Sequence, residues 1–259
     1  MTLSSKSRTE IGNILKKTIR DKLASYEPET IHAPFQHRLL GKDRYALFSF
    51  VQSMNTTFGM SIWEQVAVVL AKGAGNLAQR QYKLAGEIDV GTERFIANLH
   101  QQLRRADITS DTVRETEQIR ARIKKGQSTI NDPDRTVDFF TKVGQVDNLF
   151  DITSVKPNMK EFAALKLKLL RWKGLRLSQD KNIQIQTRLA IPYNPYYPDD
   201  YERWTLNGLF DLENGEILVA EQFWDFCGQG SVYNGLLEVF EEVGEELRKE
   251  IDKRFKEFK

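Results

Sequence analysis

Two aspartates and a lysine near the middle of the chain are residue types that can hydrolyse a phosphodiester bond. Asp138 lies in the β-rich segment 135–142, and Asp151 and Lys156 lie in a second β-rich segment, 148–156. The turn-like residues between these segments predict a β-hairpin that brings the three side chains near one another. Carboxylates on adjacent strands suit a hard cation such as Mg²⁺, and a lysine can orient the attacking water and stabilise phosphate charge. The hairpin is a candidate hydrolytic site, although an Asp and a Lys on neighbouring strands also form ordinary surface pairs.

Charged residues outside the hairpin extend this candidate site. Glu64 lies in the apolar stretch 62–70, where an unpaired charge is costly to bury, so it is either a third carboxylate of the site or a structurally paired acid. Eight Lys or Arg in the segment 156–181 stand against two acids, whereas the segment 199–252 has fifteen acids and three bases. The basic segment, with Lys160, is either a DNA-binding patch or a solvated helix face. The acidic C-terminal helix, predicted over about 233–258, is expected to pack on the core or to join two subunits, because it would repel DNA.

Composition excludes several classes of protein. The chain has 259 residues, of which 40% are hydrophobic and 29% charged, and its formal net charge is +2. No apolar run approaches the roughly 18 to 20 residues that cross a bilayer, and the first residues lack a signal-peptide pattern, so we expect a cytoplasmic protein without membrane association. The single Cys227 and the three scattered histidines, His32, His37 and His100, argue against a disulfide or a structural zinc site. A bound metal is therefore expected to be a hard cation held by carboxylates.

Apolar spacing predicts the elements that position these residues. Helices are predicted over 8–26, 42–54 and 61–72, the last with Ser61 as its N-cap, and one or two polar helices within 92–125. After the hairpin, the sequence predicts a helix over 160–172, strands over 182–191 and 216–221, and a long acidic helix over 233–258. The predicted fold class is α/β, with helices covering a sheet. A mainly helical part, 1–132, and a catalytic core, 133–259, are expected to form one integrated domain.

The order of these features resembles the PD-(D/E)XK nuclease superfamily, in which a glutamate-bearing helix precedes a hairpin that carries an Asp and then an acid-x-Lys triplet. Longer strings resemble the TdeIII-type group of type II restriction endonucleases, and they are FGMSIWE at 58–64, FDITSVKPN at 150–158, EF at 161–162, LLRW at 169–172, YNPYYP at 193–198 and VAEQFWDF at 219–226. The resemblance extends from about residue 35 to the C-terminus. It implies a mixed central sheet flanked by helices.

Within this resemblance, Asp138 matches the first metal ligand, with Val137 where the family has a proline that has no chemical role. The triplet that ends in Lys156 begins with Ser154, a position at which the family has an acid. Two sources of the second acid are open. Either a bulge lets Asp151 converge with Lys156, because strand alternation alone puts them on opposite faces, or a helix supplies the acid. Glu64 is the favoured helical acid and Glu161 its substitute. The predicted catalytic residues are Asp138, Asp151, Lys156 and Glu64, and the three acids are the predicted metal ligands.

Candidate base-reading residues lie on the predicted strand 182–191. Gln184, Gln186 and Arg188 alternate on one of its faces, and Gln and Arg can form paired hydrogen bonds with adenine and guanine edges. A half-exposed strand with a polar side gives the same pattern.

The resemblance implies a type II restriction endonuclease that cleaves double-stranded DNA at a short sequence with Mg²⁺ as cofactor. It also implies a homodimer, because two active sites related by a two-fold axis cut both strands of a symmetric site, and a companion DNA methyltransferase. The alternatives are a repair or recombination nuclease that recognises DNA structure, and a non-catalytic DNA-binding module of the same fold, for which Ser154 would mark a decayed site.

Overall fold

The computed structural model describes residues 2–27, 32–124, 129–130, 134–202, 206 and 208–256. Its centre is a five-stranded sheet whose strands, in spatial order, are β1 (Leu77–Lys83), β4 (Thr136–Val143), β5 (Val146–Ile152), β6 (Gln184–Ile191) and β7 (Ile217–Val219). The pairs β1–β4 and β4–β5 are antiparallel, whereas β5–β6 and β6–β7 are parallel. Two short strands, β2 (Ile88–Asp89) and β3 (Thr129–Ile130), pair separately. The mixed α/β fold class is confirmed, with an addition: β1, β2 and β3 come from residues 1–132, for which only helices were predicted.

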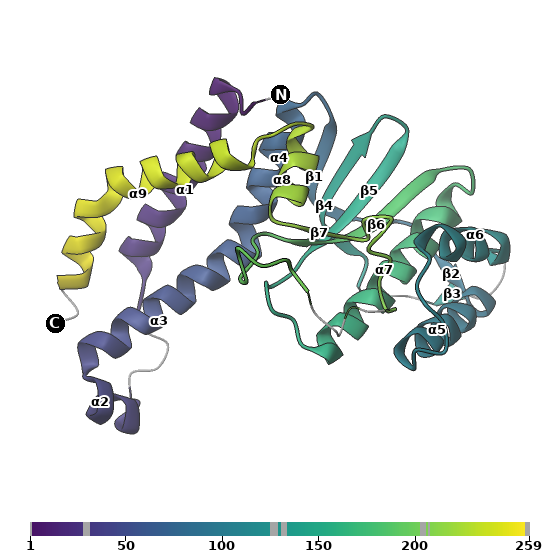
Figure 1. The fold of residues 1–259 in the computed structure, drawn as a ribbon, viewed down its shortest axis with the longest axis horizontal. Helices are drawn as coiled ribbons and strands as arrows, with labels where there is room; N and C mark the ends of the chain where they lie inside the picture. The colour runs from purple at the N-terminus through teal and green to yellow at the C-terminus, as the bar shows by residue number, and fades with distance from the viewer. Residues whose placement is uncertain are drawn as a thin grey trace.

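Helices cover both faces of the sheet and enclose two cores (Figure 1). One face packs against α5 (Val90–Arg104), α6 (Thr112–Arg122) and α7 (Met159–Gln179). The other face packs against α1 (Ser5–Ser25), α4 (Trp63–Gly73), α8 (Glu221–Gly228) and α9 (Tyr233–Lys256). In the described ranges, no helix combines the length and the apolar content that crossing a membrane requires.

The predicted helices at 42–54 and 61–72 form one continuous helical run. After α2 (Pro34–Leu40), the run consists of α3 (Lys42–Thr57), a π-helical turn η1 (Phe58–Ile62) and α4. The prediction that Ser61 caps a new helix is wrong, because Ser61 lies inside the π turn. Aromatic rings hold this turn against α9, since Trp63 stacks on Phe58 at 5.0 Å between ring centroids and on Phe240 at 5.9 Å.

The predicted hairpin is present, but its second strand is shorter than expected. β5 ends at Ile152, so Ser154 and Lys156 lie in the loop that leads to α7. The predicted helix over 160–172 continues to Gln179 because its later apolar residues, such as Leu175 and Leu177, are also buried. The predicted strand over 216–221 is reduced to β7. The first and last long helices occur where expected, and residues 257–259 lie outside the described residues.

The alternative in which the basic segment is only a solvated helix face is wrong for part of α7. Lys166 and Lys173 are fully buried. Lys166 Nζ lies 2.7 Å from Glu216 Oε1 and 2.9 Å from Glu115 Oε2. Lys173 Nζ donates to Thr112 Oγ1 at 2.6 Å and lies 3.3 Å from Glu115 Oε2. We call Lys166, Lys173, Glu115 and Glu216 the buried ion cluster. Buried charges persist only when they are paired, so this cluster fixes α7 against α6 and the segment before β7.

We predict that Lys166→Ala lowers the free energy of unfolding by about 3–5 kcal/mol, because it leaves two buried carboxylates with only Lys173 as counter-charge. Urea unfolding followed by circular dichroism measures the change. Lys160→Ala, an exposed position on the same helix, is the matched control and should change stability by less than about 0.5 kcal/mol. Equal stability of the two variants would mean that the buried ion cluster does not fix α7.

Candidate active site

Asp138 and Asp151 lie side by side on the hairpin, as the sequence predicts. The register pairs Phe139 with Phe150, which places the two aspartates opposite each other one step further along β4 and β5. Asp138 Oδ2 accepts a hydrogen bond from the backbone N–H of Ile152 at 2.9 Å. This bond ties the first carboxylate to the end of β5.

The pleat of the sheet is interrupted at Asp138. Val137 packs in the core beneath α7, but Phe139, two residues further on, packs in the core beneath α4. Regular alternation would put both residues on one face. The residue opposite Asp138 on β1 is Gln81, whose backbone is left-handed with φ +50°. Such strained residues often occur at functional sites, and here the interruption places Asp138 within electrostatic reach of side chains from both faces.

A lysine from α7 binds Asp151. Lys168 Nζ lies 2.7 Å from Asp151 Oδ2 and 3.3 Å from Asp134 Oδ1. Burial acts to lower the pKa of Lys168, but the charge of Asp151 and the hydrogen bond to it outweigh burial, so this pKa is raised and the ammonium stays charged. Burial raises the pKa of Asp151, against the opposing charge of Lys168. The Asp151–Lys168 pair therefore holds a carboxylate and an ammonium in a largely desolvated place.

Glu64 approaches from the opposite side, on the first turn of α4. Its side chain is buried, and Oε1 accepts a hydrogen bond from Gln81 Nε2 at 2.7 Å. Oε2 is buried and accepts no hydrogen bond from any described residue, while Arg80 Nε lies 3.7 Å away. Burial raises the pKa of Glu64, and the Gln81 hydrogen bond and the Arg80 charge only partly offset it. Glu64 thus presents a buried acceptor that lacks a donor.

The charges of both other acids act on the carboxyl group of Asp138. Burial, then the charge of Asp151 and, more weakly, that of Glu64 raise the pKa of Asp138 from its ordinary value of 3.8 to about 7. The backbone N–H of Ile152 and the charge of Lys168 oppose this rise. The three predicted acids are therefore brought into one electrostatic group with an excess of negative charge, which is the environment that a divalent cation relieves.

The donor set fits Mg²⁺ better than a metal that needs a full cage of protein ligands. Among the described residues, no three His, Cys, Asp or Glu side chains stand together as a ready set of metal ligands. Mg²⁺ does not require one, because it commonly binds through one or two carboxylates and keeps waters and phosphate oxygens as its other ligands. Asp138 and Asp151 could provide the two carboxylates, and Oε2 of Glu64, which accepts no hydrogen bond from the described residues, could accept one from a metal-bound water.

Lys156 does not contact this group through any interaction that the described residues make. It is exposed, and its Nζ lies 4.9 Å from the centroid of the Tyr196 ring. Glu161, the substitute acid, is also engaged elsewhere, because its Oε2 accepts the backbone N–H of Asn158 at 2.7 Å in the capping box of α7. Asp151 therefore has Lys168, rather than Lys156, as its observed partner.

The predicted DNA-contacting residues differ in their exposure. Lys160 and Gln184 are exposed, and Gln186 is half-buried. Arg188 donates a hydrogen bond to the carbonyl of Gly215, and its guanidinium lies 5.4 Å from the centroid of the Phe226 ring. Burial lowers the pKa of Arg188. The guanidinium is thus directed toward neighbouring protein groups rather than toward solvent.

Sequence reasoning missed Lys168 and Gln81. The sequence held one indication for Lys168, which lies four residues before Trp172 and so shares its helix face. In the structure the lysine Nζ lies 4.9 Å from the Trp172 ring centroid. That spacing indicated a lysine that turns toward the apolar side of α7. No sequence signal pointed to Gln81, because left-handed backbone at a glutamine is not encoded by residue type.

Residues 3–244 match the family model described as "Type II restriction endonuclease, HinfI". Two curated relatives come from Herpetosiphon aurantiacus. Type II restriction enzyme HgiCII is 25% identical over 85% of this chain and 81% of its own length, and Type II restriction enzyme HgiEI is 22% identical over 94% of this chain and 95% of its own length. No solved structure gives a significant match.

We predict that Asp138→Asn raises the melting temperature of the metal-free protein at pH 8 by a few degrees and by less at pH 5. A carboxyl group whose pKa is raised in the folded state binds its proton more firmly there, so stability falls as pH rises from about 4 to about 7 and the full penalty is present above pH 7. Asparagine carries no charge and can still accept the Ile152 N–H.

Differential scanning fluorimetry with a chelator at both pH values measures this difference. Asp107→Asn, at an exposed aspartate after α5, is the control, and its melting temperature should differ from that of the wild type by the same amount at both pH values. A rise in melting temperature for Asp138→Asn that is larger at pH 5 than at pH 8 would contradict the electrostatic account.

Proposed function

We propose that this chain, which belongs to the HinfI family of type II restriction endonucleases, hydrolyses phosphodiester bonds of double-stranded DNA at a short specific sequence with Mg²⁺ as cofactor. The chain is a restriction enzyme, as its curated relatives are named. The observation that carries the finer proposal is the placement of Asp138 opposite Asp151, with Glu64 and Lys168 directed to the same group.

In this proposal, Asp138 and Asp151 hold the metal ion. When bound, Mg²⁺ supplies charge neutralisation at the scissile phosphate and makes water more acidic. Asp138 receives the Ile152 N–H on Oδ2, so the backbone orients its carboxylate. Glu64, oriented by Gln81 through Oε1, would accept a hydrogen bond from a water molecule through Oε2, which accepts none from the described residues. We assign the lone acceptor of Glu64 to orienting water beside the phosphate.

We assign the catalytic lysine to Lys168, with Lys156 as the alternative. An ammonium that remains charged can donate hydrogen bonds to phosphate oxygens and stabilise the negative charge that develops in the transition state. Lys168 is held by Asp151 at 2.7 Å, whereas Lys156 is exposed near Tyr196. Lys168 therefore starts from a fixed position beside the carboxylates, and Lys156 would have to move toward them.

The remaining parts of the proposal follow from the substrate. Cutting both strands of a symmetric site needs two active sites related by a two-fold axis, so we propose a homodimer. Lys160 and Gln184, which are exposed, and Gln186, which is half-buried, are proposed to contact DNA. A companion DNA methyltransferase would protect the same sequence in the host.

The acidic α9 forms ion pairs with α1, namely Arg8–Glu238 and Arg20–Glu250. These pairs support the prediction that this helix packs on the core.

We predict that Asp138→Ala and Asp151→Ala each lower the cleavage rate by at least about 100-fold, because each removes a ligand whose contribution to the transition state amounts to several kcal/mol. The assay incubates plasmid DNA of known sequence with and without Mg²⁺ and maps the ends. Asp107→Ala is the control and should cleave normally. DNA binding, measured with Ca²⁺ in place of Mg²⁺, should persist.

The alternatives give different results in the same assay. A smear or cuts confined to branched DNA would indicate a structure-specific nuclease. Retarded DNA without any cutting in Mg²⁺ or Mn²⁺ would indicate a non-catalytic binding module. Wild-type rates in Asp138→Ala would refute the metal assignment.

We predict that Lys168→Ala reduces the cleavage rate by roughly 10²–10³-fold relative to the wild type, because this is the range for losing one preorganised donor to the transition state. The reduction in Lys156→Ala should be smaller. Lys168→Arg keeps the charge and should recover part of the rate. Single-turnover kinetics measure the rates, and Lys249→Ala, at an exposed lysine of α9, is the control. The reverse order would assign the catalytic role to Lys156.

A further inference from the structure

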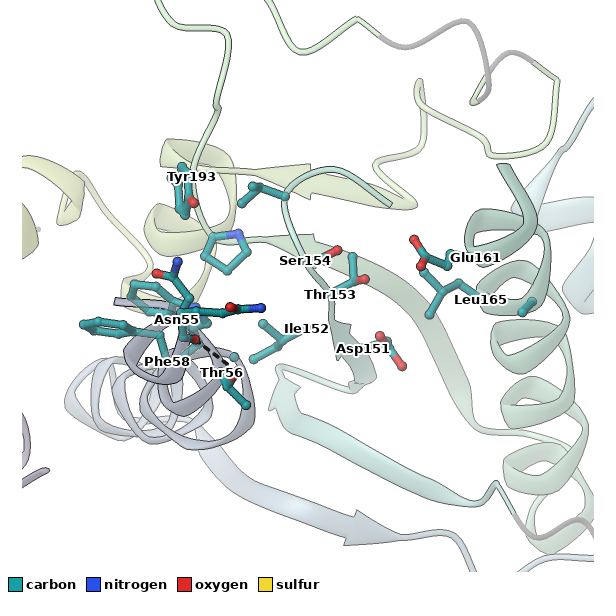
Figure 2. A pocket seen from close by; sticks show the side chains of 16 residues that line it. Asn55, Thr56, Phe58, Asp151, Ile152, Thr153, Ser154, Glu161, Leu165 and Tyr193 are labelled. Atoms are coloured by element: carbon teal, nitrogen blue, oxygen red, sulfur yellow. Dashed lines mark hydrogen bonds between the residues drawn. The ribbon is translucent and has the colours of Figure 1, made fainter. Parts of the chain in front are cut away.

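A face of α3 lines a cavity that Asp151 of the candidate active site also lines. The cavity has a volume of about 790 Å³, and its lining includes Gln52, Asn55 and Thr56 from α3 together with Asp151 and Ser154. Figure 2 shows Asn55 and Thr56 on one side of this cavity and Asp151 on the other, with Ile152 between them in this view. Side chains on this α3 face therefore border the same space as Asp151, where a phosphate of the substrate would bind.

The chemistry of this face suits contact with base edges. Gln52 and Asn55 are exposed, and within the described part of the chain neither side-chain amide has a hydrogen-bond partner. Each amide offers both a donor and an acceptor, the combination that pairs with the N6 and N7 edge of adenine. Exposed Phe48 and Val51 continue the same face, and apolar side chains of this kind contact the thymine methyl group.

The charge around α3 is also compatible with a polyanion. Between Asp43 and Glu64 the chain contains no acidic residue. The segment includes Arg44, so DNA would meet no carboxylate repulsion along this face. This contrasts with α9, whose solvent-exposed surface is rich in glutamate.

The position of α3 relative to the reaction centre is fixed by the helical run. α3 continues through η1 into α4, which carries Glu64, and the Phe58–Trp63 stack holds the junction. Figure 1 shows α3 extending from α4 away from the sheet. The 16 residues of α3 span about 24 Å, and an α-helix about 10–12 Å across fits the major groove, which is about 12 Å wide.

From these observations we infer that α3 enters the major groove beside the scissile phosphate and that Gln52 and Asn55 read base edges there. This inference rests on the proposed DNA-cleaving function of the same site. It assigns sequence reading to a helix of the N-terminal part in preference to the β6 face, where the guanidinium of Arg188 is already bound to Gly215.

The test compares Gln52→Ala, Asn55→Ala and the double variant with the wild type. Each enzyme digests a DNA library that contains randomised sites, and sequencing of the ends gives the cleavage rate at the preferred site and at every single-base substitution of it. We expect the ratio of these two rates to fall by about 5- to 150-fold at one or two base positions. Gln101→Ala removes an exposed helical glutamine outside the cavity and should leave every ratio unchanged.

The ratio separates base reading from a merely structural role. A structural defect lowers the rate at all sites together, and thermal melting would reveal it, whereas loss of a base contact changes the ratio at particular positions. Unchanged ratios in both single variants and the double variant overturn the inference. Gln184→Ala is assayed in the same way. If the ratio of cleavage rates changes in this variant and in none of the α3 variants, the inference is overturned and base reading is assigned to β6. Absence of discrete fragments from the wild type would instead refute the proposed function, and the inference with it.

Discussion

The desolvation of three neighbouring carboxylates is the constraint on which the rest of the molecule depends. Asp138 and Asp151 lie opposite each other on adjacent strands, and Glu64 adds a third buried acid from α4. Water stabilises such charges, and its removal must be offset by counter-charges or hydrogen-bond donors. The protein supplies only part of this compensation, through Lys168, Arg80, Gln81 and the Ile152 N–H. The uncompensated remainder is what makes the group suitable for a cation.

Helix α7 connects this group to the core of the protein. Lys166 and Lys173 are seven residues apart and so share a helix face, which enters the buried ion cluster. Lys168 is two residues from Lys166, about 200° around the helix, and so points to the opposite side, where it meets Asp151. A rotation of α7 would break contacts on both sides at once. The buried ion cluster therefore sets the position of the lysine at the site, although it lies away from the site itself.

The sequence predicted most of the long helices and the hairpin, but not every element or the contacts between elements. The hairpin was predictable because β-rich segments flank a short turn, and Asp138 and Asp151 followed from it. The choice of lysine was not, because charge composition cannot distinguish the buried Lys166 and Lys173 from exposed lysines such as Lys160. The π turn and the edge strand β1 were also missed, since aromatic stacking and non-local pairing determine them. Local patterns fix local structure, whereas these features depend on partners distant in sequence.

The serine at position 154 illustrates the same distinction. A triplet of acid, any residue and lysine on one strand is one way to bring a carboxylate and an ammonium to a first aspartate. Here β5 ends at Ile152, so the strand cannot present position 154 to Asp138 in that way. In the proposed site the acid comes from Asp151 on the neighbouring strand, and the ammonium comes from a helix that packs on the same face of the sheet. The serine is then no sign of lost chemistry, because the requirement is spatial. A carboxylate and an ammonium must reach the first aspartate, and the elements that carry them are free to differ.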